Sequence, residues 1–141
     1  MINLNDGYTV LPDLPKYQTG DVVKHRLYEY RGLIVEIDST CQAEEAWYQS
    51  NQTKPDRNQS WYHILVDGNQ QVTYVAESNI DLDSSGNPIV HSMLNLFFYG
   101  VDEKNNKYLR NDIPFQPGKP PDALPPPPPE DIPPLPPTNI I

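Results

Sequence analysis

The sequence predicts a mostly β protein: a small barrel with one short inserted helix and a disordered, proline-rich C-terminal tail. Three observations predict this class. Short β-prone runs bounded by turn residues recur along the first 113 residues. Only one run has a helical composition. Thirteen of the 17 prolines lie between Pro114 and Pro137, and such a segment cannot join a packed core.

These features divide the 141 residues into three parts. Residues 1–15 are expected to form a flexible N-terminal arm, and residues 16–113 are long enough for one small folded domain. Residues 114–141 are expected to form a disordered proline-rich tail, in which the run 124–137 favours polyproline II, an extended and exposed structure. We expect this tail to act as a spacer or to bind an aromatic-lined groove of a partner.

Two strands are expected at the start of the domain. The first covers residues 20–25 and begins at a turn glycine. The second covers residues 32–38, where Leu33, Val35 and Ile37 share one face by the two-residue period. This alternation predicts a half-buried strand.

The one helical run covers residues 42–50. It contains no glycine or proline, and Glu44 and Glu45 lie in its first turn, where the helix dipole favours acids. Adjacent helical residues point in different directions, so the two glutamates do not form an acid–base pair.

A β-hairpin is expected next. The strands are residues 61–66 and 72–76, and the turn contains Asp67-Gly68. The apolar run 93–99 is helix or strand, since periodicity does not distinguish the two. Several short strands and one helix in a chain of this size predict an SH3-like barrel. Its aromatic core is expected to contain Trp47, Trp61, Tyr62 and Tyr74.

The chain carries 10 Lys and Arg against 19 Asp and Glu, a net charge of −9, which disfavours non-specific binding to nucleic acid. The charge is uneven. Residues 16–31 hold four basic and two acidic side chains. Residues 32–103 hold two basic and eleven acidic side chains, and residues 104–119 hold four basic and one acidic side chain. If the two basic stretches meet in space, with tyrosines between them, they would form a phosphate-contacting patch. Arg31 is the best candidate for a bidentate contact. The DNA-binding candidates are Lys24, His25, Arg26, Tyr30, Arg31, Lys104, Lys107 and Arg110.

Other classes of function are disfavoured. The sequence has no apolar run long enough to cross a membrane, and we expect a cytoplasmic protein because no signal peptide is visible and Cys41 is the only cysteine. His25, His63 and His91 lack the spacing of metal ligands, and His63 is expected to be a hydrogen-bonded structural residue. We expect no catalytic residue, metal or cofactor. The oligomeric state stays open, a homo-oligomer included.

Several blocks over residues 16–112 resemble the hemimethylated DNA-binding family, also called YccV-like or heat-shock protein HspQ. They are Tyr17–His25, Tyr30–Gly32, Ile37-Asp38, Glu44–Tyr48, Lys54–Asp56, Trp61–Gly68, Thr73–Glu77, Asn79-Ile80, Ser85–Ile89 and Tyr108. The chain departs from the family at Ser92, where proline is usual.

The resemblance implies a β-barrel without enzymatic activity that binds hemimethylated DNA. It also implies an alternative function, a heat-shock specificity factor or adaptor for the Lon protease that acts through protein–protein contacts. The tail lies outside the resemblance.

Overall fold

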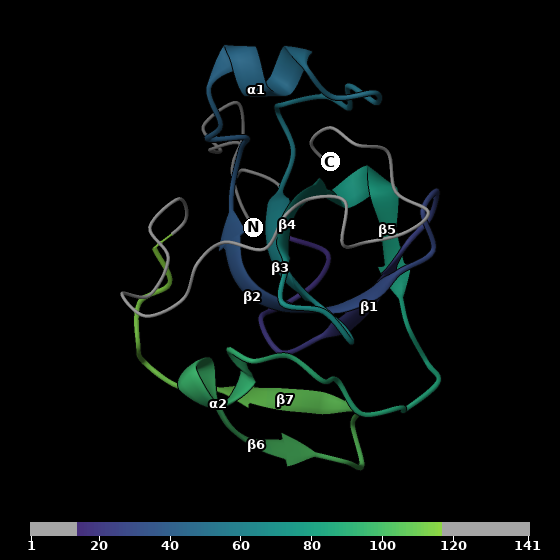
Figure 1. Ribbon diagram of the computed structural model, residues 1–141, viewed down its shortest axis with the longest axis vertical. Helices are drawn as coiled ribbons and strands as arrows, with labels where there is room; N and C mark the ends of the chain where they lie inside the picture. The colour runs from purple at the N-terminus through teal and green to yellow at the C-terminus, as the bar shows by residue number, and fades with distance from the viewer. Residues whose placement is uncertain (1–13, 117–141) are drawn as a thin grey trace, which may run out of the picture.

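The computed structural model describes residues 14–116 (Figure 1). Its elements are β1 (Val22–His25), β2 (Arg31–Asp38), α1 (Glu45–Gln49), β3 (Trp61–Val66), β4 (Val72–Ala76), the 3-10 helix η2 (Glu77–Asn79), β5 (Ile80–Leu82), α2 (Leu94–Phe97), β6 (Phe98–Asp102) and β7 (Lys107–Arg110). The expected mostly β class is confirmed, although residues 14–116 contain α1, α2 and η2 where one short helix was expected. No helix of these described residues is long and apolar enough to span a membrane.

The strands form two antiparallel sheets. The larger has the order β4-β3-β2-β1-β5, and the smaller consists of β6 and β7. Figure 1 shows β6, β7 and α2 together at one end of the larger sheet, and a bridge between Asp21 and Lys107 joins the two sheets. Within residues 14–116 no ladder links β4 to β5, so closure into an SH3-like barrel stays a prediction.

The central hairpin forms as the sequence predicts. β3 and β4 cover the expected residues, and the turn between them contains Gly68 with a φ of 78°. The helix is confirmed but shorter than expected, because Glu44 is already extended and serves as the N-cap residue. The ambiguous run 93–99 contains both structures: α2 ends at Phe97 and β6 begins at the next residue.

The expected strand over residues 32–38 is confirmed as part of β2, but its first half is buried on both faces. Leu33, Ile34 and Val35 are all 0% exposed, because Leu33 and Val35 pack against residues of α2, β6 and β7 while Ile34 packs with Tyr17, Tyr62 and Ile80. A bulge between Ile34 and Glu36 shifts the register. Ile37 therefore packs with Ile34 and not with Val35.

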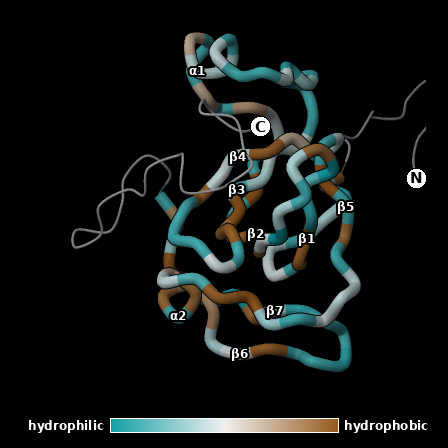
Figure 2. The backbone as a smooth tube through the Cα atoms, turned by 45° about the vertical axis from the view of Figure 1, so that its right-hand side comes forward, coloured by the Kyte–Doolittle hydropathy of each residue, from teal (hydrophilic) through white to brown (hydrophobic). Residues whose placement is uncertain are grey.

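Two apolar clusters lie on opposite faces of the larger sheet. One lies between the larger sheet and the β6–β7 end, and the other on the opposite face with Tyr17, Tyr62 and Ile80. Figure 2 shows the hydrophobic stretches in the strands, whereas the loop after α1 and the β6–β7 turn are hydrophilic. The polar ends of the molecule are thus separated by its core.

The proline-rich segment contributes one residue to the core, contrary to the expectation for residues 114–141. Phe115 packs against the cluster beneath β6 and β7, and its ring centroid lies 5.6 Å from that of Phe97. Phe115 follows the last strand by five residues, and its aromatic ring has a large apolar surface to bury against the cluster. Residues 1–13 and 117–141 lie outside the described residues, so the flexible arm and the disordered tail stay predictions.

Candidate nucleic-acid interface

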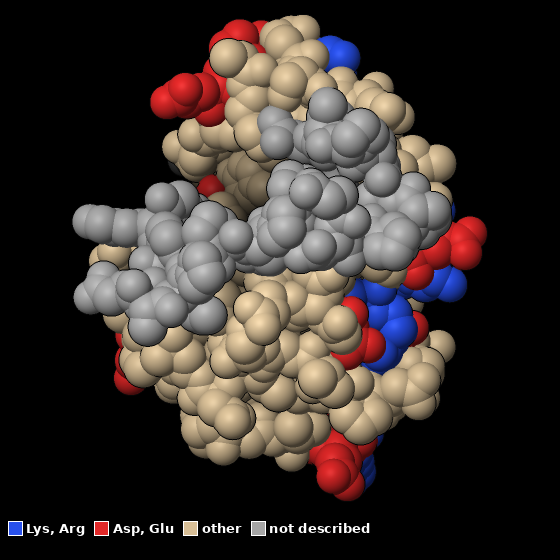
Figure 3. Space-filling view, in the orientation of Figure 1, with Lys and Arg blue, Asp and Glu red and all other residues tan. Residues whose placement is uncertain are grey.

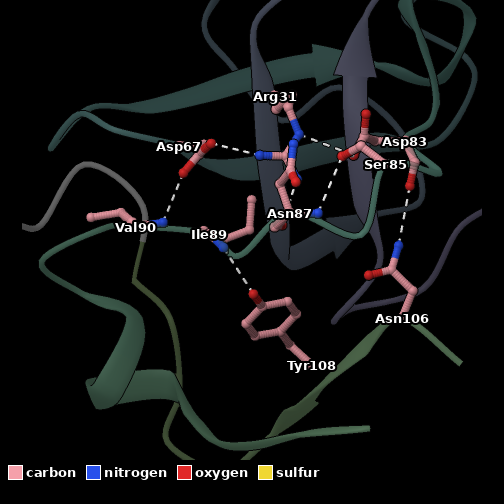
Figure 4. Close-up of polar contacts among 9 residues, drawn as sticks. All are labelled: Arg31, Asp67, Asp83, Ser85, Asn87, Ile89, Val90, Asn106 and Tyr108. Carbon is pink, nitrogen blue, oxygen red and sulfur yellow. Dashed lines mark hydrogen bonds and ion pairs between the residues drawn. The ribbon is translucent and has the colours of Figure 1, made fainter. Parts of the chain in front are cut away.

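Arg31, the strongest candidate from the sequence, is enclosed by acceptors (Figure 4). Its guanidinium donates from Nη1 to Asp67 Oδ2 at 2.7 Å, from Nε to Asp83 Oδ2 at 3.0 Å, and from Nη2 to the Asn87 carbonyl at 2.7 Å. The Arg31 side chain is only 18% exposed. We call Arg31, Asp67, Asp83 and Asn87 the Arg31 cluster.

Strand pairing explains why these side chains meet. Arg31 opens β2 and Asp67 directly follows β3, and the pairing of Gly32 with Val66 places these two ends side by side. Asp83 directly follows β5, on the other side of β1. The cluster therefore joins three separate parts of the chain.

The cluster also holds the segment 83–90 in place. Asp67 Oδ1 accepts the Val90 N–H at 2.7 Å, and the Ser85 hydroxyl donates to Asp83 at 2.6 Å. Burial disfavours the charged form of Asp83, but hydrogen bonds from Ser85 and Arg31 outweigh it and lower the pKa of this carboxyl. The Arg31 fork is thus occupied, and a phosphate or guanine would have to displace two carboxylates.

The basic residues of β7 are engaged in the same way. Arg110 donates from Nε to the Val35 carbonyl at 2.9 Å and from Nη1 to the Ile113 carbonyl at 2.8 Å. Burial lowers the pKa of Arg110, although nearby Glu36 acts in the opposite direction. Lys107 Nζ lies 3.5 Å from Asp21 Oδ1. These two cations are part of the packing between the sheets.

The two basic stretches do come together, but not as a positive patch. The Asp83 side chain binds Arg31 while its carbonyl accepts from Asn106 Nδ2 at 3.2 Å. Tyr108 is buried beneath them, where its hydroxyl accepts the Ile89 N–H. Figure 3 shows the same pattern on one face, where basic side chains lie beside acidic ones.

The β1–β2 turn, residues 26–29, is the open part of this region. It is organised by His25, which is 1% exposed and whose Nδ1 accepts the N–H groups of Leu27 and Tyr28, both at 3.1 Å. The Glu29 N–H donates to the His25 carbonyl, and the ring of Tyr30 stacks on that of His25. The predicted candidates His25 and Tyr30 therefore shape the turn from beneath.

The turn presents one cation, Arg26, one apolar side chain, Leu27, and one carboxylate, Glu29, to solvent. The Arg26 side chain is 50% exposed and pairs with Asp81 at 2.9 Å, and Leu27 is 58% exposed. Lys24 is exposed on β1 and lies opposite Asp81 in the ladder, and Lys16 is exposed nearby, since its charge acts on Asp81. Lys24 forms no ion pair with any residue of 14–116.

Lys104 does not belong to this surface. It is exposed in the turn between β6 and β7, which Figure 1 places at the far end of the molecule from the β1–β2 turn. The structure thus brings Lys24 and Arg26 together and separates Lys104 from them.

The structure also tests the polar residues for a metal site. Over residues 14–116 no group of three His, Cys, Asp or Glu side chains could hold a metal ion. His63 is structural as expected, since its Nε2 lies 3.1 Å from Asp38 Oδ2 and its side chain is buried.

Sequence comparison adds a family to this geometry. A family model described as "Hemimethylated DNA-binding protein YccV like" matches residues 15–105, which is more than half of the chain. The match includes the β1–β2 turn and the whole Arg31 cluster, whereas β7 and Phe115 lie beyond it.

Proposed function

Because the chain belongs to the YccV-like hemimethylated DNA-binding family, we propose that it is a non-enzymatic DNA-binding protein that contacts DNA through the β1–β2 turn. The observation that carries this proposal is the exposed pair Arg26 and Leu27 on a turn held by a buried histidine. An SH3-like barrel and a cytoplasmic location remain predictions that agree with it.

The turn has the shape and chemistry that the major groove accepts. A two-stranded β-ribbon fits into this groove. Arg26 would exchange the exposed Asp81 carboxylate for a phosphate or a guanine edge. Leu27 would supply the apolar contact through which a base methyl group is recognised in the major groove.

Preorganisation favours the turn over the other basic residues. The two hydrogen bonds to His25 Nδ1 already hold the backbone on either side of Leu27, so little conformational entropy remains to be lost on binding. By contrast, Arg31 and Arg110 would have to leave buried partners.

The test is fluorescence anisotropy with matched unmethylated, hemimethylated and fully methylated duplexes. We expect the tightest binding to the hemimethylated duplex and a steep loss of affinity with added salt. Arg26→Ala should weaken binding to all three duplexes and lower the salt slope by about 1. Leu27→Ala should reduce the preference for the hemimethylated duplex more than the affinity itself.

Lys54→Ala is the matched control, because this lysine is also exposed but lies on the loop after α1 and bonds the Asn51 carbonyl. It should leave all three affinities unchanged. No binding of the wild-type protein at about 50 mM salt would contradict the DNA role, since phosphate contacts are strongest at low salt.

A Lon adaptor role is the second candidate, and one surface favours it. Tyr99 is 73% exposed and Val101 is 46% exposed on β6, and exposed apolar side chains of this kind suit a protein contact. If DNA does not bind, degradation of a model substrate by purified Lon should change on adding this protein. Tyr99→Lys should abolish that change.

A further inference from the structure

We propose that a row of aromatic rings on β3, β4 and α1 binds the chain's own segment Pro117–Pro120. The proposal is independent of the DNA-binding function. It rests on the aromatic row itself, on the point at which the described chain ends, and on the sequence of the residues that follow.

The aromatic row consists of Phe115, His63, Tyr74 and Trp47. The ring centroid of Phe115 lies 5.2 Å from that of His63, which stacks on Tyr74 at 4.4 Å. Tyr74 in turn lies 5.8 Å from Trp47. The row therefore leads from the last described residues of the chain to the helix α1.

The far end of the row is both accessible and rigid. Trp47 and Tyr74 are half-buried, so part of each ring faces outward. The Tyr74 hydroxyl donates to Asp38 at 2.6 Å and accepts the Gln42 N–H at 2.9 Å. A surface held in this way is ready to bind without rearranging.

The segment that follows Phe115 can reach this end. The three centroid distances of 5.2, 4.4 and 5.8 Å bound the path from Phe115 to Trp47 to about 15 Å, which polyproline II covers in about five residues at about 3.1 Å each. Counted from Phe115, these residues are Gln116 to Pro120. At this spacing Pro117 would reach His63 and Pro120 would reach Trp47.

The chemistry of the two partners matches. The sequence Pro117-Gly118-Lys119-Pro120 is a PxxP motif, and such motifs bind aromatic-lined surfaces as polyproline II helices. Its Lys119 would approach an acidic border. Asp38 lies at the row, since it accepts the Tyr74 hydroxyl at 2.6 Å, and Glu44 directly precedes the helix that carries Trp47.

Covalent attachment makes even a weak contact effective. Because Phe115 is already packed against Phe97 and His63, only a few residues separate the motif from its binding surface. A short tether gives an effective concentration of about millimolar or more. A contact that would be negligible between separate molecules is then largely occupied within one.

The experiment compares two full-length variants by tryptophan fluorescence. The first replaces Pro117, Pro120 and Pro121 with serine, and the second replaces Pro133, Pro134 and Pro136. The chain has two tryptophans, and Trp61 is 0% exposed, so changes in quenching by acrylamide report on Trp47. We expect the first variant to show stronger quenching and a red-shifted emission, while the second matches the wild type.

Two further measurements complete the test. Lys119→Glu should shift quenching in the same direction as the first variant, because it opposes the acidic border. Equal quenching in the wild type and the first variant, with unchanged far-ultraviolet circular dichroism, would overturn the proposal. So would a wild-type signal that depends on protein concentration, since the segment would then bind a second copy.

Discussion

Two arginines of the same hairpin have opposite situations. Arg31, at the start of β2, is 18% exposed and donates to three acceptors. Arg26, at the β1–β2 turn, is 50% exposed and has one exposed carboxylate partner. The two residues are only five positions apart, so the fold and not the local sequence decides which arginine is available for a ligand.

The difference follows from what each arginine faces. The sheet order places β3 and the segment after β5 around the start of β2, and both supply an aspartate. The β1–β2 turn projects beyond the sheet, where, among residues 14–116, Arg26 forms an ion pair with Asp81 of β5 alone. A charge enclosed by the fold contributes to stability, whereas a charge at a turn remains free for recognition.

The largest expected effect is the loss of the enclosed arginine. Arg31→Ala leaves Asp67 and Asp83 without their shared cation and frees the segment 83–90, so the free energy of unfolding should fall by about 2–4 kcal/mol. Urea denaturation followed by circular dichroism measures this change.

Arg31→Lys provides the control for charge alone. It keeps the cation but cannot donate in three fixed directions, so an intermediate loss is expected. Arg26→Ala should leave the urea midpoint almost unchanged, because its ion pair is fully exposed. Equal stability of Arg31→Ala and the wild type would show that the cluster does not hold the fold together.

The sequence is informative wherever local pattern decides the structure. The β3–β4 hairpin was predicted because apolar β-prone residues flank an Asp-Gly turn. The position of α1 was predicted because residues 42–50 contain no glycine or proline and have acids in their first turn. The family resemblance, carried by blocks such as Trp61–Gly68, is confirmed by the family model.

The sequence fails where distant residues decide the outcome. Asp67 and Asp83 lie 36 and 52 positions from Arg31, so no local pattern shows that this arginine is enclosed. The bulge after Ile34 and the packing of Phe115 likewise depend on neighbours that the fold brings in. Leu27 was not among the DNA-binding candidates named from the sequence. The signal that could have identified it is its place in a turn, where an apolar side chain has no core to join.

A smaller effect is expected from the histidine beneath the open turn. His25→Ala removes the acceptor of the Leu27 and Tyr28 N–H groups and leaves a cavity under Tyr30, which should cost about 2 kcal/mol. The amides of the two turn residues should also exchange faster with solvent deuterium. His25→Asn is the partial rescue, since its side-chain oxygen is a local acceptor. Unchanged exchange at both amides would show that the turn does not depend on His25.

The smallest expected effect is on stability at low pH, and it distinguishes the aspartate partner of Arg31 from that of Arg26. Although burial opposes it, the Ser85 and Arg31 contacts lower the pKa of Asp83 in the folded protein, and the hydrogen bond to Arg26 lowers that of Asp81. Each pair therefore adds stability above the unfolded pKa of about 4, and this stability is lost as the pH falls through the lower folded pKa.

Asp83→Asn and Asp81→Asn should each reduce the loss in urea midpoint between pH 7 and pH 3. In about 1 M salt the Asp81 effect should vanish, because exposed charges are screened, whereas the enclosed Asp83 should keep most of its effect. Equal salt sensitivity of the two variants would mean that the Arg31 cluster is as open to solvent as the turn.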